Sequence, residues 1–177
     1  MPESEPTTEP TTEPTTDPTA VAAQPRLSPH RLYRTVAIAE AVTWTLLIAG
    51  MILKYVLDAG DVGVRVGGFV HGFVFLAYGM TAVLVGLNQR WSVRLIAAAL
   101  LTAVVPYATV PFDRWLERRN LLDGAWRTTA SDDPRDGTAV DRMLRGVLRH
   151  PVLLAAGLAV ALVAIFATLL VLGPPGR

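Results

Sequence analysis

Four long blocks of apolar residues dominate the pattern of this chain. They run over about 36–57, 66–87, 93–112 and 152–172. A helix of about 22 residues is roughly 33 Å long, and the hydrocarbon core of a bilayer is about 30 Å thick. The apolar residues do not recur with the period of a soluble amphipathic helix or strand. The pattern therefore predicts an all-α, multi-pass transmembrane helical bundle in which every block crosses the bilayer.

The connections between the blocks predict how these helices are arranged. About eight residues join the first block to the second, so the two helices form an antiparallel hairpin. The third block follows the short turn at 88–90 and contains Pro106 and Pro111. Each proline removes a backbone donor, so we expect the last turns of the third helix to bend or loosen.

The remaining segments are polar. Residues 1–30 hold the repeated unit Glu-Pro-Thr-Thr, which begins at Glu5, Glu9 and Glu13. A proline in every four residues excludes a helix, so this segment is predicted to be a disordered acidic tail. A loop over 113–150 is rich in Arg and Asp. Its last part, 140–150, has an amphipathic helical pattern and is expected to lie on the membrane surface.

Charge predicts an orientation for the bundle. The net charge is +1, the mean hydropathy is +0.39, and 16 Lys and Arg residues stand against 15 acidic ones. With four crossings, an external amino terminus places the Arg-rich loop 113–150 in the cytoplasm, as the positive-inside rule favours. Arg31 and Arg34, just before the first helix, favour the opposite orientation. We predict the cell membrane, with the amino terminus outside.

Ionisable side chains inside the apolar blocks are the first candidates for function, because they are costly in hydrocarbon. Glu40 lies about one turn inside the first helix, and in a four-crossing bundle it shares a membrane side with Arg94. We predict a Glu40–Arg94 ion pair. A role of Glu40 in proton or ion coupling is the alternative.

Two further ionisable residues are expected toward the opposite side of the bilayer. Lys54 reaches the interface by the length of its own side chain. His71, about one turn into the second helix, is interpreted as a packed, hydrogen-bonded histidine, with a protonation switch as the alternative. Asp113 and Arg114 are interpreted as a charged exit of the third helix on this same side.

Glycines in the second block predict where helices approach closely. Gly68 and Gly72 form a small-xxx-small pair, and Gly72, Gly79 and Gly86 recur every seven residues. Glycines on one stripe let the backbone of another helix come near. We therefore expect this stripe to pack against a second copy of the chain or against a larger membrane complex, with the lipid bilayer as the other partner.

Motifs for catalysis or cofactor binding are absent from the sequence. The chain has no Cys, no Gly-rich phosphate loop, no His-Glu-x-x-His and no Gly-x-Ser-x-Gly. No catalytic, metal or cofactor site is predicted, and we do not expect an enzyme. The Arg-rich loop also carries many Asp residues, which does not indicate a nucleic-acid surface.

Short motifs over residues 33–119 give the sequence a family resemblance. They are Val36–Ala41, Leu53–Val56, Val70–Phe75, Trp91-Ser92, Val105–Tyr107 and Phe112–Trp115. In order and spacing they resemble the YdzA-like bacterial membrane proteins of domain-of-unknown-function family 3817. The resemblance implies a three-helix membrane core to which the block 152–172 adds a fourth, carboxyl-terminal helix. It implies no reaction.

Two functions remain open on this reading. The first is a structural or interaction subunit in the cell membrane, which the glycine stripe and the lack of catalytic groups favour. The second is a small proton- or ion-coupled transporter or channel subunit that uses Glu40 and His71. An intramembrane enzyme is a distant third, because no nucleophile or metal cluster supports it.

Overall fold

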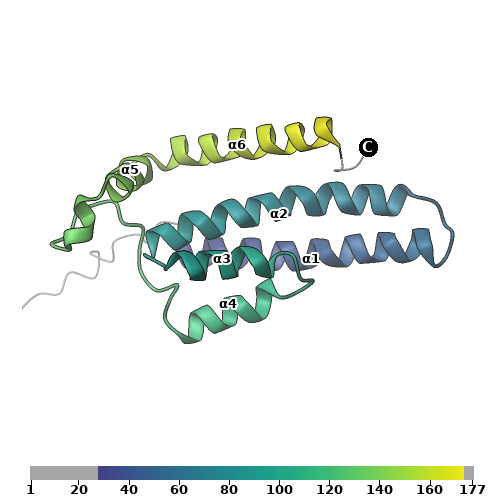
Figure 1. The fold of residues 1–177 in the computed structure, drawn as a ribbon, viewed down its shortest axis with the longest axis horizontal. Coiled ribbons are helices and arrows are strands. Elements are labelled where there is room, and N and C mark those ends of the chain that lie inside the picture. Colours follow the sequence, from purple (N-terminus) through teal and green to yellow (C-terminus); the bar gives the residue numbers. More distant parts are fainter. Residues whose placement is uncertain (1–27, 174–177) are drawn as a thin grey trace, which may run out of the picture.

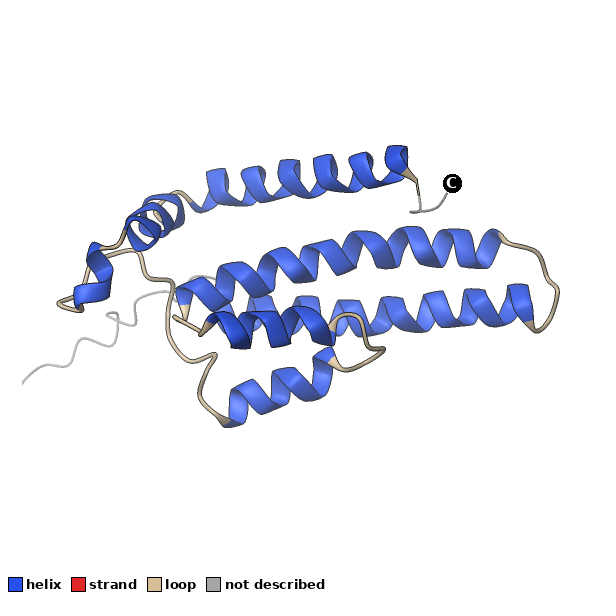
Figure 2. Ribbon diagram, viewed as in Figure 1, coloured by secondary structure: helices blue, strands red, loops and turns tan. Residues whose placement is uncertain are grey.

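The computed structural model describes residues 28–173, and every regular element within them is helical (Figures 1 and 2). The elements are α1 (Pro29–Tyr55), α2 (Val62–Asn88), α3 (Val93–Thr102), α4 (Thr109–Arg118), the 3-10 helix η2 (Pro134–Gly137), α5 (Ala139–Leu148) and α6 (Pro151–Leu172). The all-α class is confirmed. The predicted disorder of the acidic repeat falls on 1–27, outside the described residues.

Within the described residues, three helices have the length and apolar composition needed to cross a membrane. They are α1, α2 and α6, with 27, 27 and 22 residues. The side chain of Ser28 caps α1 by accepting a hydrogen bond from the backbone N–H of Arg31. α1 and α2 lie antiparallel along their whole length, as the short connection predicted, and α6 runs beside α2 (Figure 1).

The third apolar block does not cross the membrane, contrary to the prediction. α3 ends at Thr102, the chain turns, and α4 runs back from Thr109 (Figure 2). Each of these helices has 10 residues, which is roughly 15 Å or half of a bilayer core. Pro106 supplies no backbone N–H and disfavours helical geometry at the residue before it, and Tyr107 adopts a left-handed φ of 64°.

Both ends of this α3–α4 hairpin lie at the end of the bundle where α1 begins. The indole Nε1 of Trp91, before α3, donates to the carbonyl oxygen of Leu121, after α4, at 2.8 Å. Near the end of α4, Glu117 pairs with His30 in the first turn of α1. The loop after α4 and the start of α1 therefore share one side of the membrane. The sequence predicted an amino terminus outside the cell and the loop 113–150 in the cytoplasm. These two predictions place the segments on opposite sides, so they cannot both hold in this fold.

The closest helix contact is made by glycines of α1 and α2 that the heptad pattern did not single out. A Cβ atom at Gly50 would lie 2.5 Å from the backbone of Gly63, and one at Gly67 would lie 2.8 Å from a backbone oxygen of α1. Such a contact admits no side chain without backbone movement, which costs about 1–3 kcal/mol.

The predicted glycine stripe faces helices of its own chain. The nearest side chains to Gly68, Gly72, Gly79 and Gly86 are those of Leu47, Phe166, Leu100 and Ile96, respectively. These belong to α1, α6 and α3. Of these four glycines Gly86 is buried, while Gly68, Gly72 and Gly79 are half-buried, so the packing of the stripe against another protein stays a prediction.

Cysteine labelling tests the path of the chain, because the protein has no cysteine of its own. We expect Arg31→Cys and Arg118→Cys to react with a membrane-impermeant maleimide from the same side, and Ala59→Cys from the other side. Intact cells and inside-out vesicles provide the two sides. A spanning third helix would instead make Arg118→Cys react together with Ala59→Cys.

Candidate functional site

A row of polar side chains follows the inner face of α1 from its first turn to the middle of the helix. His30, Tyr33, Glu40 and Thr43 succeed one another at spacings that a helix of 3.6 residues per turn brings to one side. Tyr33 and Glu40 are fully buried, and Thr43 is 5% exposed. The row faces α2 and the α3–α4 hairpin, and we call it the polar row.

The outer end of the polar row is an ion cluster that ties α4 to α1. Glu117 Oε1 accepts hydrogen bonds from His30 Nε2 at 2.6 Å and from Arg34 Nη1 at 2.5 Å. The hydrogen bond from His30, with the positive charge of Arg34, holds the pKa of Glu117 below its ordinary value. This contact fixes the far end of α4 at the membrane surface.

The next layer is a pair of tyrosines between α1, α2 and α3. The hydroxyls of Tyr33 and Tyr78 are 2.8 Å apart. The Tyr78 hydroxyl also lies 3.1 Å from both the carbonyl oxygen of Ala99 and Oγ1 of Thr102. Tyr33 packs edge-on against the ring of Trp91, with centroids 5.7 Å apart. The Tyr78 hydroxyl is therefore a hydrogen-bond donor to the carbonyl oxygen of Ala99, close to the point where α3 ends.

Glu40 is paired with the hairpin rather than with Arg94. The Thr109 hydroxyl lies 2.9 Å from Glu40 Oε2, while Glu40 Oε1 is buried without a hydrogen-bond partner among the described residues. Arg94 is exposed in the first turn of α3. The predicted ion pair is therefore wrong, because the reversal at the hairpin brings the start of α4, not of α3, against Glu40.

Asp113 lies one turn beyond Thr109, on Glu40's side of the membrane. It is 4% exposed, and its Oδ1 atom has no hydrogen-bond partner among the described residues. The prediction that Asp113 shares a side with Lys54 and His71 is wrong for Lys54, which lies at the opposite end of α1. Arg114, which was interpreted together with Asp113 as a charged exit of the third helix, is exposed.

The inner end of the polar row is formed by His71. Its Nδ1 atom is 3.1 Å from Thr43 Oγ1, and its ring packs on Trp44 with centroids 4.4 Å apart. Trp44 Nε1 donates to the carbonyl oxygen of Ala103 at 3.2 Å, which anchors the tip of the hairpin. His71 is thus a packed, hydrogen-bonded residue.

Past His71, the interface between α1 and α2 contains glycines and apolar side chains as far as Lys54, whose Nζ lies 5.3 Å from the centroid of the Tyr55 ring. The polar row therefore enters from one membrane surface and stops about halfway across. Within residues 28–173, no group of three or more His, Asp or Glu side chains is arranged to hold a metal ion.

The segment predicted as a polar Arg/Asp loop with an amphipathic last part folds into a charged cap on the end of α2. Arg90 pairs with Asp133 and Asp136. Arg127 Nη2 contacts Asp141 at 2.8 Å, and Arg127 Nε donates to the carbonyl oxygen that ends α2, at 2.6 Å. Alternating Arg and Asp residues were the available signal, but their pairing depends on the fold.

Asp136 is the centre of the charged cap. Both the backbone N–H and the hydroxyl of Ser131 donate to its Oδ2, at 2.6 and 2.8 Å. These bonds, with the charges of Arg90 and Arg145, hold the pKa of Asp136 at about 2. Arg145 also donates to the Asp136 backbone oxygen at 2.7 Å, so the cap fastens α5 in place.

Comparison with known proteins gives a family but no activity. A family described as "Domain of unknown function (DUF3817)" matches residues 30–118. A protein of Streptomyces coelicolor named "Putative membrane protein SCO5905" is 41% identical over 93 residues. These residues are 52% of this chain but 11% of that protein. No solved structure matches the chain.

Stability at low pH tests the charged cap. Because folding lowers the pKa of Asp136 to about 2, its contribution is present above about pH 4 and is lost as the pH falls toward 2. We expect Asp136→Ala to lower the melting temperature in detergent at pH 7 and to flatten the acid limb of the stability curve. Asp132→Ala, at an exposed neighbouring carboxylate, is the control. Equal melting temperatures for both variants would contradict the assignment.

Proposed function

This chain belongs to the family described as domain of unknown function (DUF3817), and we propose that it is an accessory, structural subunit of a larger complex in the cell membrane. The observation that carries the proposal is the length of its relative. The matched residues make up 11% of the relative named "Putative membrane protein SCO5905". Helices that form part of a longer membrane protein in the relative are suited to pack against further membrane helices in an assembly.

The interior of the bundle supports an assembly role over a transport role. The polar row is hydrogen-bonded to α2 and to the hairpin of the same chain, and it stops at His71. A conduction path needs polar groups or water across the whole bilayer. The far half of the α1–α2 interface is instead closed by the contact of Gly50 with Gly63.

The outer face of α1 is the surface best placed for a partner. It belongs to the residues that the family shares, whereas α6 lies beyond them and covers α2. Ile38, Val42 and Leu46 are each about half exposed along this face. In lipid, close packing and not hydrophobic burial drives helix association, so a partner helix can replace lipid there.

Charge supports a cytoplasmic position for the cap. Of the Lys and Arg residues within 28–173, all but Lys54 and Arg65 belong to the end where α1 begins. The positive-inside rule then favours an amino terminus and a charged cap that are both cytoplasmic. This orientation replaces the external amino terminus expected from four crossings.

Site-specific photocrosslinking tests the assembly role. A photoreactive phenylalanine analogue is placed at Val42 on the outer face of α1, which is 54% exposed, and at Val160 of α6 as the control, which is 70% exposed. In the native membrane we expect an adduct with one larger membrane protein from Val42 and none from Val160. Adducts with lipid alone at both positions, together with purification as a single chain, would contradict the proposal.

Proton coupling through Glu40 and His71 is the second candidate, favoured by the buried Glu40 oxygen that has no partner within the described residues. It requires an oligomer or a partner to supply the other half of the path. On this reading, proteoliposomes show a pH-driven proton flux that Glu40→Gln abolishes. A flux that is absent, or equal in the two proteins, rejects it.

A further inference from the structure

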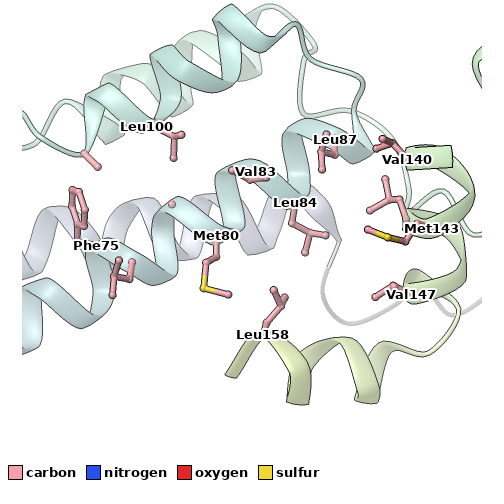
Figure 3. A pocket seen from close by; sticks show the side chains of 14 residues that line it. Phe75, Met80, Val83, Leu84, Leu87, Leu100, Val140, Met143, Val147 and Leu158 are labelled. Carbon is pink, nitrogen blue, oxygen red and sulfur yellow. The ribbon is translucent and has the colours of Figure 1, made fainter. Parts of the chain in front are cut away.

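An apolar groove opens on the face of α2 between α3 and α6 (Figure 3). Its volume is about 580 Å³. Phe75, Met80 and Leu87 of α2 form its floor, and Leu100, Met143 and Leu158 line it from α3, α5 and α6. All its lining residues are apolar.

The groove has the length of one membrane leaflet. From Phe75 to Leu87 is 12 residues of helix, or roughly 18 Å, and half of a hydrocarbon core is about 15 Å. One end lies next to the charged cap, where α5 runs across it (Figures 1 and 3). The other end, at Phe75, is near the middle of the membrane.

Two contacts hold α6 beside α2 and leave the groove between them. Toward the far membrane surface, the ring of Phe166 packs on Phe69 and Phe73, with centroids 4.9 and 5.5 Å away. Near the cap, Leu154 and Leu158 of α6 pack against a cluster that Leu84 of α2 forms with two leucines of α5. The charged cap holds α5, and α6 follows α5 along α2 on the other side of the groove from α3.

We propose that this groove binds one acyl chain of a phospholipid from the leaflet on the side of the charged cap. A helix is 10–12 Å wide, so one turn occupies roughly 420–610 Å³, and the groove admits about one turn of a partner helix. An acyl chain is thinner and follows the whole length of the groove. It needs no hydrogen bonds, and Met80 and Met143 adapt their side chains to its shape.

The helix that crosses the cap end of the groove, α5, also carries an arginine for a lipid phosphate, on the side of the helix away from the groove-lining residues. Arg142 precedes Met143 on α5 and is exposed, and it makes no ion pair with any residue from 28 to 173. In contrast, Arg90, Arg127 and Arg145 are all paired within the cap. A free guanidinium at headgroup depth complements a phosphate charge.

Native mass spectrometry tests the lipid site on the full chain. The protein is reconstituted with palmitoyl-oleoyl phosphatidylcholine and transferred to a mild detergent. We expect the native protein to retain one lipid, and Val83→Trp, which fills the groove, to retain at least fivefold less. Val160→Trp, on the open face of α6, is the matched control and keeps the native level. Met143→Trp, at a 71% exposed groove position, repeats the test with no change in the core.

The other outcomes overturn the proposal. Equal retention by the native protein and by both folded groove variants, with helix content verified by circular dichroism, shows that the lipid does not occupy the groove. A native dimer that Val83→Trp converts to a monomer, without loss of lipid, makes the groove an interface between copies. Neither result depends on whether a larger protein partner exists.

Discussion

Hydrocarbon offers no hydrogen bonds, so a helix that breaks inside the membrane must find partners for its backbone within the protein. The α3–α4 hairpin depends on this constraint. Tyr78 reaches the carbonyl of Ala99, and Trp44 reaches that of Ala103 at the tip of the hairpin. Thr109, at the start of α4, bonds back to α1 through Glu40 and the carbonyl of Ala37. The polar row and the interrupted helix are therefore one structural unit.

This dependence changes the meaning of the buried ionisable residues. Glu40 and His71 stood out in the sequence because charged groups in a membrane are costly. In the structure both take part in hydrogen bonds around a reversal of the chain, at the depth where the reversal occurs. The chain reversal therefore explains why Glu40 and His71 lie at this depth, without a bound ligand. One oxygen of Glu40 is buried and has no hydrogen-bond partner in the described part of the chain. This oxygen is the observation that supports a chemical role for Glu40.

The sequence predicted α1, α2 and α6 because hydropathy summed over about 20 residues measures what a spanning helix needs. It did not predict the hairpin. Residues 93–112 would be equally apolar in one spanning helix and in a hairpin that turns back halfway, so their hydropathy does not distinguish the two. Pro106 and Pro111 are the visible signal, but by themselves they predict only that the last turns of a spanning helix bend or loosen. The paired glycines Gly50 and Gly63 lie on different helices, so no repeat within one helix shows them. The pairing of Arg90 with Asp136 likewise joins distant segments, which composition alone cannot specify.

The half-depth hairpin also gives the molecule an unequal cross-section. In the leaflet beside the charged cap, the described chain displaces lipid with α1, α2, α6 and both arms of the hairpin (Figure 1). In the opposite leaflet only α1, α2 and α6 remain. The protein is therefore a wedge, broad on the side of the charged cap and narrow on the other. Lipids around such a wedge pack with a lateral stress that differs between the two monolayers, so the bilayer's curvature and the protein's fold are mechanically linked.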